Sequence, residues 1–576
     1  MITRDDDLHI RLGRIRSRGI QRSRPFIAQA LAAAEKAGGL GRASRSRTRK
    51  SAFGRGRAAS LAAARHLTDR SRGVVVKARV VRHGIKRVTL NAHLTYLRRE
   101  GVTKEGGPGR MFDAERDDAD HRAFAERCEG DRHHFRFIVS PDDAAELSDL
   151  KTFTRDLMTH AERDLGTKLD WVAVDHWNTE HPHIHVIVRG RAHDDHDLVI
   201  SRDYIREGMR ARAQELVTLE LGPRSDQDIR RSLEAQVEAE RWTHLDRALA
   251  REAAPNGGIV DLRPNRDQTP NELHAIKVGR MRKLERLGLA QQTNGQWMLA
   301  DNAEPTLRAL GERNDIIKRI HYGLARHGWE RGASSFDLAG EAETTPIVGR
   351  LVTRGLDDEL KGTAYAVIDG VDGRAHYIRL PDLDATGDSE PGSIVELRRY
   401  EDAKGRQRLA VAVRSDLAIE AQVKADGATW LDRQLLARAP SLSEGGFGRE
   451  VREAMDARVD HLVSEGLARR QGQRIVFVRD LLDTLRQREL AAAGAKLLEE
   501  TGLPYHPIAD GGSAAGVVRQ RVNLASGRFA MLDDGLGFSL VPWTPSLERQ
   551  LGNHLTGKIM GGRVEWDFAR RRGLAI

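Results

Sequence analysis

The sequence lacks the features that mark disulfide-stabilised or membrane-spanning proteins. Its 576 residues include one cysteine, Cys128, so a disulfide framework is excluded and a reducing, cytoplasmic setting is expected. No apolar run reaches the roughly 18 residues that a membrane-spanning helix needs. Aromatic residues make up only 5% of the chain. The length exceeds what one hydrophobic core supports, so several domains are expected.

The charge is unevenly distributed along the chain. Residues 1–80 contain 20 Lys and Arg against 5 Asp and Glu, whereas the remainder contains 74 basic and 79 acidic residues. Residues 1–72 are rich in Arg, Ser and Gly and poor in large apolar side chains, which predicts a disordered basic arm. Such an arm is either a solvated tail or a segment that binds a polyanion, most often nucleic acid.

Hydrophobic periodicity predicts an α+β domain with an antiparallel sheet over residues 73–200. Ser140, followed by Pro141 and acidic residues, has the signature of a helix N-cap. The expected elements are strands at 74–82 and 133–139, helices at 86–100 and 149–164, and two further strands joined by a short polar turn.

The second half of the chain is internally duplicated. The stretch "RMRKLERLGLAQQTNGQWML" (280–299) is similar to "ARVDHLVSEGLARRQGQRIVFV" (457–478). Each copy predicts a helix, a glycine turn and a two-stranded wing, which is a winged-helix pattern that could contact duplex DNA or proteins; plain helical hairpins are the alternative. The expected segments are a helical extension at 201–262, winged-helix-like parts at 263–335 and 416–490, and small β-barrel-like parts at 344–415 and 500–576.

Four histidines in "HWNTEHPHIHVIVRG" (176–190) indicate a metal centre. Residues two apart in a strand share a face, so His181, His183 and His185 point the same way. If the residues "TE" form a two-residue turn, His176 lies opposite His183, with Cβ atoms about 5 Å apart. His176, His183 and His185 are then predicted to bind one ion and to leave coordination positions open, as catalytic metal sites do.

Two chemistries fit this stretch. "HPHIHVI" satisfies the pattern of histidine-triad nucleotide hydrolases and transferases, in which a histidine is the nucleophile and no metal is needed. The alternative is metal-assisted phosphoryl transfer with a separate nucleophile. Tyr96 is a candidate because it falls about 120° from the apolar stripe of its predicted helix. A phenol needs a nearby cation or metal to become nucleophilic, and Arg98, Arg99 and the metal site could supply that field.

Three motifs, in this order, resemble those of the HUH-type single-tyrosine DNA relaxases that start conjugative transfer and mobilisation. They are Tyr96 in "AHLTYLRREG", Ser140 in "FRFIVSP", and "HWNTEHPHIH". The likeness covers residues 74–190 and is closest to the branch that includes the T-DNA border-nicking relaxase. The remainder, with "LVPW" and the paired "GRL…DG" and "GRF…DDG" segments, resembles a long C-terminal region of uncharacterised function found in one relaxase subfamily.

The resemblance implies a function and a set of roles. Tyr96 would attack a scissile phosphate in single-stranded DNA at a transfer origin, form a 5′-phosphotyrosine and later rejoin the strand. Mg²⁺ or Mn²⁺ would be held by the three predicted histidine ligands, and Ser140, Arg98 and Arg99 would contact DNA. Accessory DNA-binding proteins and a type IV secretion coupling protein are the expected partners.

The sequence departs from the relaxase pattern in the turn between the strands. Related proteins often read His-x-Asp-x-Asp-His-Pro-His-x-His, whereas here the two acids are replaced by Asn178 and Glu180. Glu180 or Asp175 could instead orient a metal-bound imidazole, and Glu180 is one candidate for the group that accepts the phenolic proton. His181 is the other candidate for that base, and it could also be a fourth metal ligand or a neighbour of the phosphate. Tyr204 follows the histidines, where rolling-circle replication initiators place their nucleophile, and is the competing tyrosine. A non-catalytic DNA-binding protein with a degenerate site is a third class.

Overall fold

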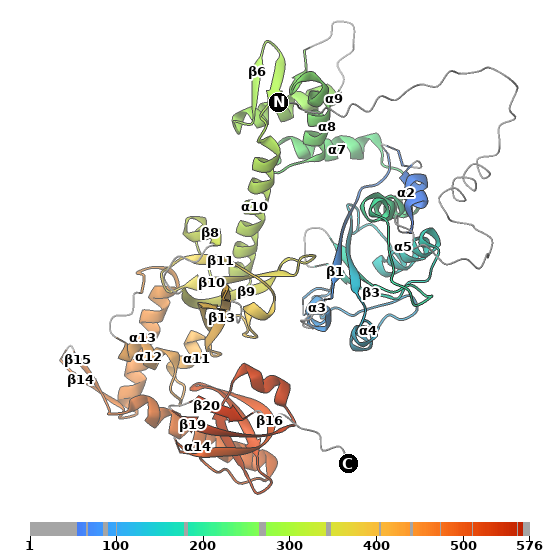
Figure 1. The fold of residues 1–576 in the computed structure, drawn as a ribbon. Helices are drawn as coiled ribbons and strands as arrows, with labels where there is room; N and C mark the ends of the chain where they lie inside the picture. The colour runs from blue at the N-terminus through green and yellow to red at the C-terminus, as the bar shows by residue number, and fades with distance from the viewer. Residues whose placement is uncertain are drawn as a thin grey trace, which may run out of the picture. The chain divides into compact units, whose positions relative to one another are not determined.

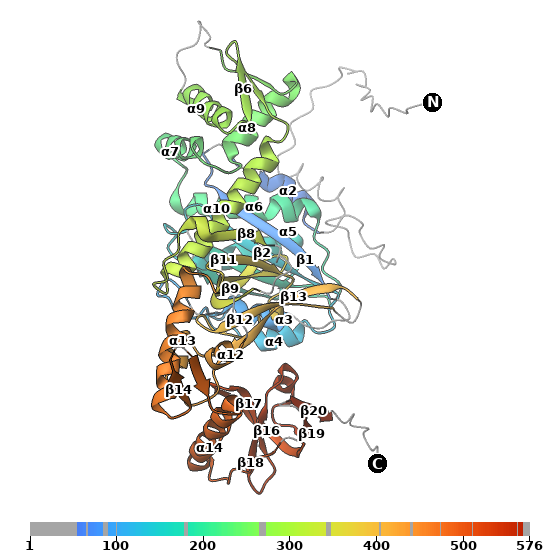
Figure 2. The same cartoon turned by 90° about the vertical axis from the view of Figure 1, so that its left-hand side faces the viewer.

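The computed structural model describes residues 55–64, 67–68, 70–83, 90–99, 101–177, 182–263, 272–340, 347–401, 405–437, 442–472, 474–509, 511–560 and 563–567. The chain divides into two compact units, residues 1–229 and 230–576 (Figure 1; Figure 2). The fold class is mixed α and β with mainly antiparallel sheets, as predicted. Residues 1–54 of the predicted basic arm lie outside the described residues, and Arg57–Ala64 forms helix α2. No helix in the described ranges is long and apolar enough to cross a membrane.

The first unit is built on a four-stranded antiparallel sheet of order β1-β2-β4-β3. Its strands are β1 (Val74–Arg82), β2 (His133–Pro141), β3 (Trp171–His176) and β4 (His183–Arg189). The predicted strands at 74–82 and 133–139 are both present. The central strands are buried along most of their length on both faces, which explains the nearly continuous apolar run that ends the histidine stretch.

Helices cover both faces of this sheet. They are α3 (Leu90–Leu97), α4 (His121–Arg127), α5 (Leu150–Leu165) and α6 (Met209–Leu221). Helices α5 and α6 share one buried cluster with Val186 and Val188. Helices α3 and α4 share another with Val172 and Ile187, which point to the opposite face. The histidine positions belong to the face covered by α3 and α4.

The predicted role of Ser140 as a helix N-cap is wrong. Ser140 lies inside β2, and residues 142–146 after it form turns in place of the predicted helix. The helix predicted at 149–164 is present as α5, which begins at Leu150. Asp149 is its N-cap: the carboxylate accepts hydrogen bonds from the backbone N–H groups of Lys151 and Thr152. Apolar cross-strand packing extends β2 through Pro141, and the acidic residues after it form turns instead of a first helical turn.

The second unit contains one series of helices and a hairpin twice. The first copy is α7 (Asp226–Val237), α8 (His244–Ala253), α9 (Glu272–Arg286), β6 (Ala290–Thr293), β7 (Gln296–Leu299) and α10 (Ala303–Ala325), with β5 (Ile259–Asp261) added to the hairpin. The second copy is α11 (Ile419–Val423), α12 (Trp430–Leu436), α13 (Gly446–Ser464), β14 (Ala468–Gln471), β15 (Arg474–Phe477) and α14 (Leu481–Thr501). The similar stretches at 280–299 and 457–478 occupy matching elements.

A sheet follows each copy, and the two sheets share one strand order. The first has β8 (Phe336–Gly340), β9 (Val348–Asp358), β10 (Thr363–Gly370), β11 (Ala375–Leu380), β12 (Ile394–Glu401) and β13 (Gln407–Ser415). The second has β16 (Ser513–Leu524), β17 (Gly527–Asp533), β18 (Phe538–Pro542), β19 (His554–Met560) and β20 (Arg563–Asp567). The order β11-β10-β9-β12-β13 corresponds to β18-β17-β16-β19-β20.

The predicted β-barrel-like segments are instead open sheets. Within the described residues, β8 and β13 are the unjoined edges of the first sheet, and β18 and β20 those of the second. A long helix covers part of each sheet: Ile320 of α10 packs with Val352 and Val367, and Leu497 of α14 packs with Phe529. Because a helix buries these apolar residues, the sheets need not close on themselves.

Each copy is fixed by a buried ion pair between corresponding residues. Arg280 donates to both carboxylate oxygens of Asp246 at 2.8 and 2.9 Å, and Arg458 bonds to Asp432 at 2.9 and 2.9 Å. All four side chains are fully buried. The remaining guanidinium N–H groups donate to the carbonyls of Val237, Ala239 and Arg241 in the first copy, and of Val423, Ala425 and Gly427 in the second. The duplication therefore extends to individual hydrogen bonds.

The first sheet has one addition, the parallel strand β8, which a histidine ties to β11. His376 is buried, with Nδ1 3.0 Å from the Asp337 carboxylate and Nε2 3.0 Å from the Asp372 carboxylate. Burial disfavours the imidazolium, but the hydrogen bonds and charges of Asp372 and Asp337 outweigh it and raise the pKa of His376. The charged imidazolium therefore stabilises this edge of the sheet.

We expect His376→Gln to lower the thermal unfolding temperature of the second unit in a pH-dependent way. A histidine whose pKa is raised in the folded state stabilises the fold while it is charged. This stabilisation is complete below the pKa of the unfolded state, about 6.5, and is lost as the pH rises through the pKa of the folded state. The difference from wild type should therefore be largest in mildly acidic buffer and shrink in alkaline buffer. His321→Gln, at an exposed position of α10, is the matched control. A pH-independent difference would contradict the assignment.

Candidate functional site

The pairing of β3 with β4 brings three histidines to one face of the first sheet. The Cα atom of His176 pairs with that of His183, and Val174 pairs with His185. Directly opposed residues share a face, as do residues two apart in one strand. His176, His183 and His185 therefore point the same way, as the sequence predicts. Glu180 and His181, the predicted proton acceptors, lie outside the described residues.

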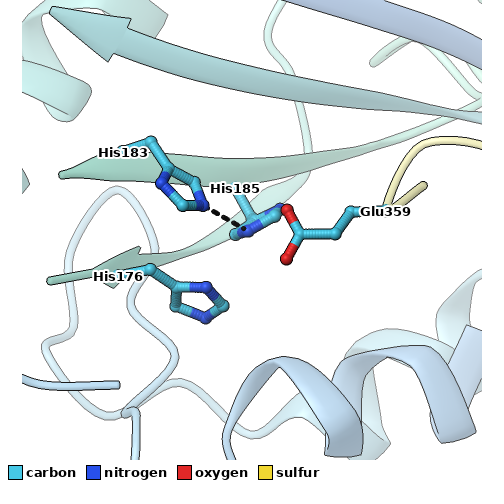
Figure 3. Close-up of side chains that lie close together, drawn as sticks. All are labelled: His176, His183, His185 and Glu359. Atoms are coloured by element: carbon cyan, nitrogen blue, oxygen red, sulfur yellow. Dashed lines mark hydrogen bonds between the residues drawn. The ribbon is translucent and has the colours of Figure 1, made fainter. Parts of the chain in front are cut away.

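The three imidazole rings form a compact group (Figure 3). Their ring centroids are 4.5 to 5.4 Å apart, and the nitrogens that could bind an ion lie within 4.8 Å of one another. His176 and His185 are buried, whereas His183 is half-buried and opens the group to solvent. Glu359, drawn in the same view, belongs to the second unit, and we take only the three histidines as candidate ligands.

The donor set fits a divalent ion. Two imidazole nitrogens bound to one ion at about 2.1 Å lie about 3 to 3.5 Å apart. The Nε2 atoms of His183 and His185 are 3.2 Å apart. His176 Nε2 lies 2.8 Å from the carbonyl oxygen of Leu97 and donates to it, which leaves the lone pair on Nδ1. A backbone carbonyl thus fixes the tautomer and the orientation of one ligand, as is common around bound metals.

That carbonyl belongs to the helix that carries Tyr96. Leu94 and Leu97 of α3 are fully buried in one cluster with Val172 and Val174, on the histidine face. Tyr96, which precedes Leu97, packs at the border of this cluster and is half-buried. The structure therefore brings the predicted nucleophile and the predicted metal ligands to the same side of the sheet.

The two arginines after Tyr96 have different surroundings. The Arg99 guanidinium lies over the Tyr96 ring, 4.3 Å from its centroid. Arg98 Nη1 lies 2.9 Å from Nδ1 of His121 on α4. Burial, followed by the charge of Arg98, lowers the pKa of His121, so a neutral imidazole accepts this hydrogen bond. Arg99 therefore supplies positive charge at the tyrosine ring, and Arg98 joins α3 to α4.

Tyr204, the competing tyrosine, lies on the other side of the sheet. It begins a short π-helix (Tyr204–Gly208) and is buried in the cluster that contains Val186 and Val188. Its hydroxyl donates to the Asp164 carboxylate at 3.0 Å, and Arg212 bonds to the same carboxylate. Burial and the negative charge of Asp164 raise the pKa of Tyr204. A phenol held in this way is a poor nucleophile at neutral pH.

Ser140 lies next to the histidine strand. Its hydroxyl donates to the carbonyl of Pro182 at 3.3 Å, directly before His183. In β2, Ile138 pairs with His185, so Ile138 and Ser140 point to the histidine face. The serine that belongs to the second motif therefore adjoins the group of histidines, although it is not a helix cap.

The histidine face carries cations that the sequence analysis did not single out. Lys77 and Arg79 of β1 are exposed and point to it, and Arg136 of β2 is buried there. Arg136 donates to His134 Nε2 at 3.0 Å, and burial followed by the charge of Arg79 lowers its pKa to about 10. None of the described strand residues that point to this face is acidic. Alternation in "HHFRFIVSP", read together with β1, would have found this pattern.

A scan of protein families identifies the second half of the chain. Residues 277–404 and 397–575 match the family described as "Protein of unknown function (DUF3363)". The matched segments together span more than half of the chain, which therefore belongs to this family. No curated protein and no solved structure matches the chain.

We expect the full chain to bind Mn²⁺ more tightly than Mg²⁺, because imidazole nitrogen suits transition ions and Mg²⁺ prefers oxygen. His183→Ala should weaken Mn²⁺ binding by more than the roughly 10–100-fold that removing a supporting hydrogen-bond partner costs. Isothermal titration calorimetry measures both effects. His196→Ala, at an exposed loop position of the same unit, is the control and should bind as wild type does. Equal affinities in both variants would remove the three histidines as ligands.

Proposed function

We propose that residues 73–200 form the catalytic domain of an HUH-type, single-tyrosine DNA relaxase that nicks and rejoins one strand at a transfer origin. The observation that carries the proposal is the hydrogen bond from His176 to the carbonyl of Leu97, the residue after Tyr96. It joins the tyrosine helix to the three histidines on one sheet face. The order of Tyr96, Ser140 and the histidine stretch in the sequence adds the resemblance to relaxases.

The proposed reaction is a transesterification at phosphorus. The Tyr96 oxygen attacks the scissile phosphodiester, the bond to the 3′-oxygen breaks, and the 5′-phosphate remains on the tyrosine. The phenolic proton passes to a base, for which Glu180 and His181 are the candidates, and the departing 3′-oxygen gains a proton. A bound Mg²⁺ or Mn²⁺ would polarise the phosphate and offset its charge. One phosphodiester replaces another, so the reaction needs no ATP and the strand can be rejoined.

The charge distribution supports a polyanionic substrate. Lys77, Arg79 and Arg136 lie on β1 and β2, to one side of the histidines, on a face without strand carboxylates. Phosphate groups would meet attraction there without competing negative charge. Ser140 and Arg99 are the predicted DNA contacts that adjoin the histidines and the tyrosine. Arg98 is the weaker of the predicted contacts because His121 already accepts from its guanidinium.

The second unit has a different charge pattern, which favours protein partners over duplex DNA. Several cations of α9 are paired with acids: Lys283 with Glu238 and Glu240, and Arg286 with Glu238. Arg282 is exposed and has no carboxylate ion-pair partner among the described residues. A winged-helix recognition surface for DNA would present such cations unpaired to phosphates. Accessory proteins at the origin and a type IV secretion coupling protein are the partners that we propose for this unit.

We expect a covalent protein–DNA adduct to form with single-stranded origin DNA and Mn²⁺, and to be lost by a factor of about 10³ or more in Tyr96→Phe. Phenylalanine keeps the ring under Arg99 and removes only the hydroxyl. Tyr204→Phe should keep the adduct and lose about 1 kcal/mol of stability with its hydrogen bond to Asp164. Labelled DNA on a denaturing gel is the measurement.

The same gel, run beside a nucleotide-turnover assay and a DNA-binding assay under native conditions, separates the alternatives. An adduct lost only in Tyr204→Phe would identify a rolling-circle initiator. Nucleotide turnover without an adduct, unaffected by chelator, would point to a histidine-triad enzyme. DNA binding without an adduct or turnover would leave a non-catalytic DNA-binding protein.

A further inference from the structure

A cavity of about 440 Å³ opens at the end of β3, an edge strand of the first sheet. Its volume lies within the roughly 300–1,000 Å³ of small-molecule sites. It is lined by the loop after α3, the first turn of α5 and the end of β3. Its lining includes the cations Lys104, Arg110 and Lys151, the ring of Trp177, and the carboxylates of Glu105 and Asp175. Trp177 directly follows the candidate ligand His176, but its side chain packs with the cluster on the α5 side of the sheet. A strand that ran from the histidines into this cavity would therefore cross the sheet edge formed by β3.

Trp177 is held in place from two sides. Its indole Nε1 donates to Asp175 at 2.6 Å, and its backbone N–H donates to the carbonyl of Val102 at 2.7 Å. The ring is half-buried, and the Lys104 ammonium lies over it, 5.4 Å from the centroid. Lys104 is exposed, so a planar ligand that stacked on this ring face would take the place of its ammonium group.

The opposite wall is a loop that carries its own hydrogen bonds. Gly101 N donates to the carbonyl of Gly107 at 3.1 Å, and Gly107 N donates to the Thr103 hydroxyl at 2.8 Å. Gly109 lets this loop approach the sheet: a Cβ atom there would lie 2.8 Å from Val102 and 3.0 Å from Val174. Both walls are therefore set before a ligand arrives, which lowers the entropic cost of binding.

The cavity offers cations as well as an aromatic face. Lys104 and Arg110 are exposed and Lys151 is half-buried, and none of them has a carboxylate ion-pair partner among the described residues. The Asp175 carboxylate at the cavity already accepts from Trp177. An aromatic ring for a base and several cations for phosphates are the combination that binds single-stranded nucleic acid.

We propose that this cavity binds one nucleotide of the substrate strand where the strand passes the sheet edge formed by β3. The base stacks on Trp177, and Lys104, Arg110 and Lys151 contact the flanking phosphates. The proposal rests on the proposed relaxase function and specifies where that strand runs. It makes Trp177 a positioning residue for the strand and assigns it no part in bond breaking.

The test uses the full chain carrying Tyr96→Phe, so that bound DNA is not cleaved, and a short single-stranded oligothymidylate with one iododeoxyuridine. Irradiation should crosslink the iodinated base to Trp177, identified by mass spectrometry. Trp177→Ala should weaken binding about fivefold or more, whereas Trp177→Phe should keep most of it because a ring remains. Lys151→Ala should make the affinity for DNA less sensitive to salt: the slope of the logarithm of the binding constant against the logarithm of the salt concentration should fall by about 0.7 in magnitude. Arg210→Ala, at an exposed position of α6 that does not line the cavity, is the matched control.

The outcomes separate this proposal from the function on which it rests. Unchanged Mn²⁺ affinity in Trp177→Ala would show an intact domain, so weaker DNA binding would then report the cavity. Equal affinities for Trp177→Ala and Trp177→Phe, with crosslinks elsewhere, would overturn the cavity proposal even if wild type forms the Tyr96 adduct. A Trp177 crosslink in a protein that forms no adduct would keep the cavity and overturn the relaxase function.

Discussion

The antiparallel pairing of β3 with β4 is the constraint on which the candidate site depends. His176 stands opposite His183, and His185 follows on the same face. Side chains alternate between faces, so a shift of one residue in this register would bury His183 and His185 among the residues that pack on α5. The carbonyl of Leu97 binds His176 and thereby sets α3 against the same strands. One register therefore determines the ligand set, the helix that carries Tyr96, and the position of Trp177 at the strand end.

The second unit depends on buried charge. Each repeat encloses an arginine that binds an aspartate and several carbonyls, and a further network joins the repeats: Arg350 lies between Trp329 and Phe447 and bonds to Asp369 and Glu450. Removing one partner of such a pair leaves an uncompensated charge, which costs about 3–5 kcal/mol, although the intact pair adds little net stability. These networks require one arrangement of helices and strands. The two repeats therefore share the same buried hydrogen bonds even where their sequences differ.

The sequence predicted features that follow from local periodicity and missed those that depend on tertiary packing. Alternation placed β1 and β2, and a two-residue turn placed His176 opposite His183. Ser140 has the local signature of a helix cap, yet cross-strand packing keeps it in β2. Closed barrels and open sheets have the same alternating strands, and only the packing of α10 and α14 distinguishes them. The sequence did not identify Arg136 or Trp177 as candidate site residues. Their surroundings depend on residues that pair with Arg136 across the sheet and on the loop that faces Trp177, and neither can be read from local sequence.

The charge of the histidine face also bears on why a covalent intermediate could persist. The proposed exchange converts one phosphodiester into another, so substrate and phosphotyrosine carry the same charge. A face with Lys77, Arg79 and Arg136 and no strand carboxylate would attract both to a similar extent. Because the face would lower the free energies of substrate and phosphotyrosine equally, it would add no driving force for cleavage. An enzyme that must hold one DNA end and later rejoin it needs that balance. In the proposed reaction the sheet face would retain the strand, and the difference in free energy between cleavage and rejoining would depend on Tyr96, its base and the bound ion.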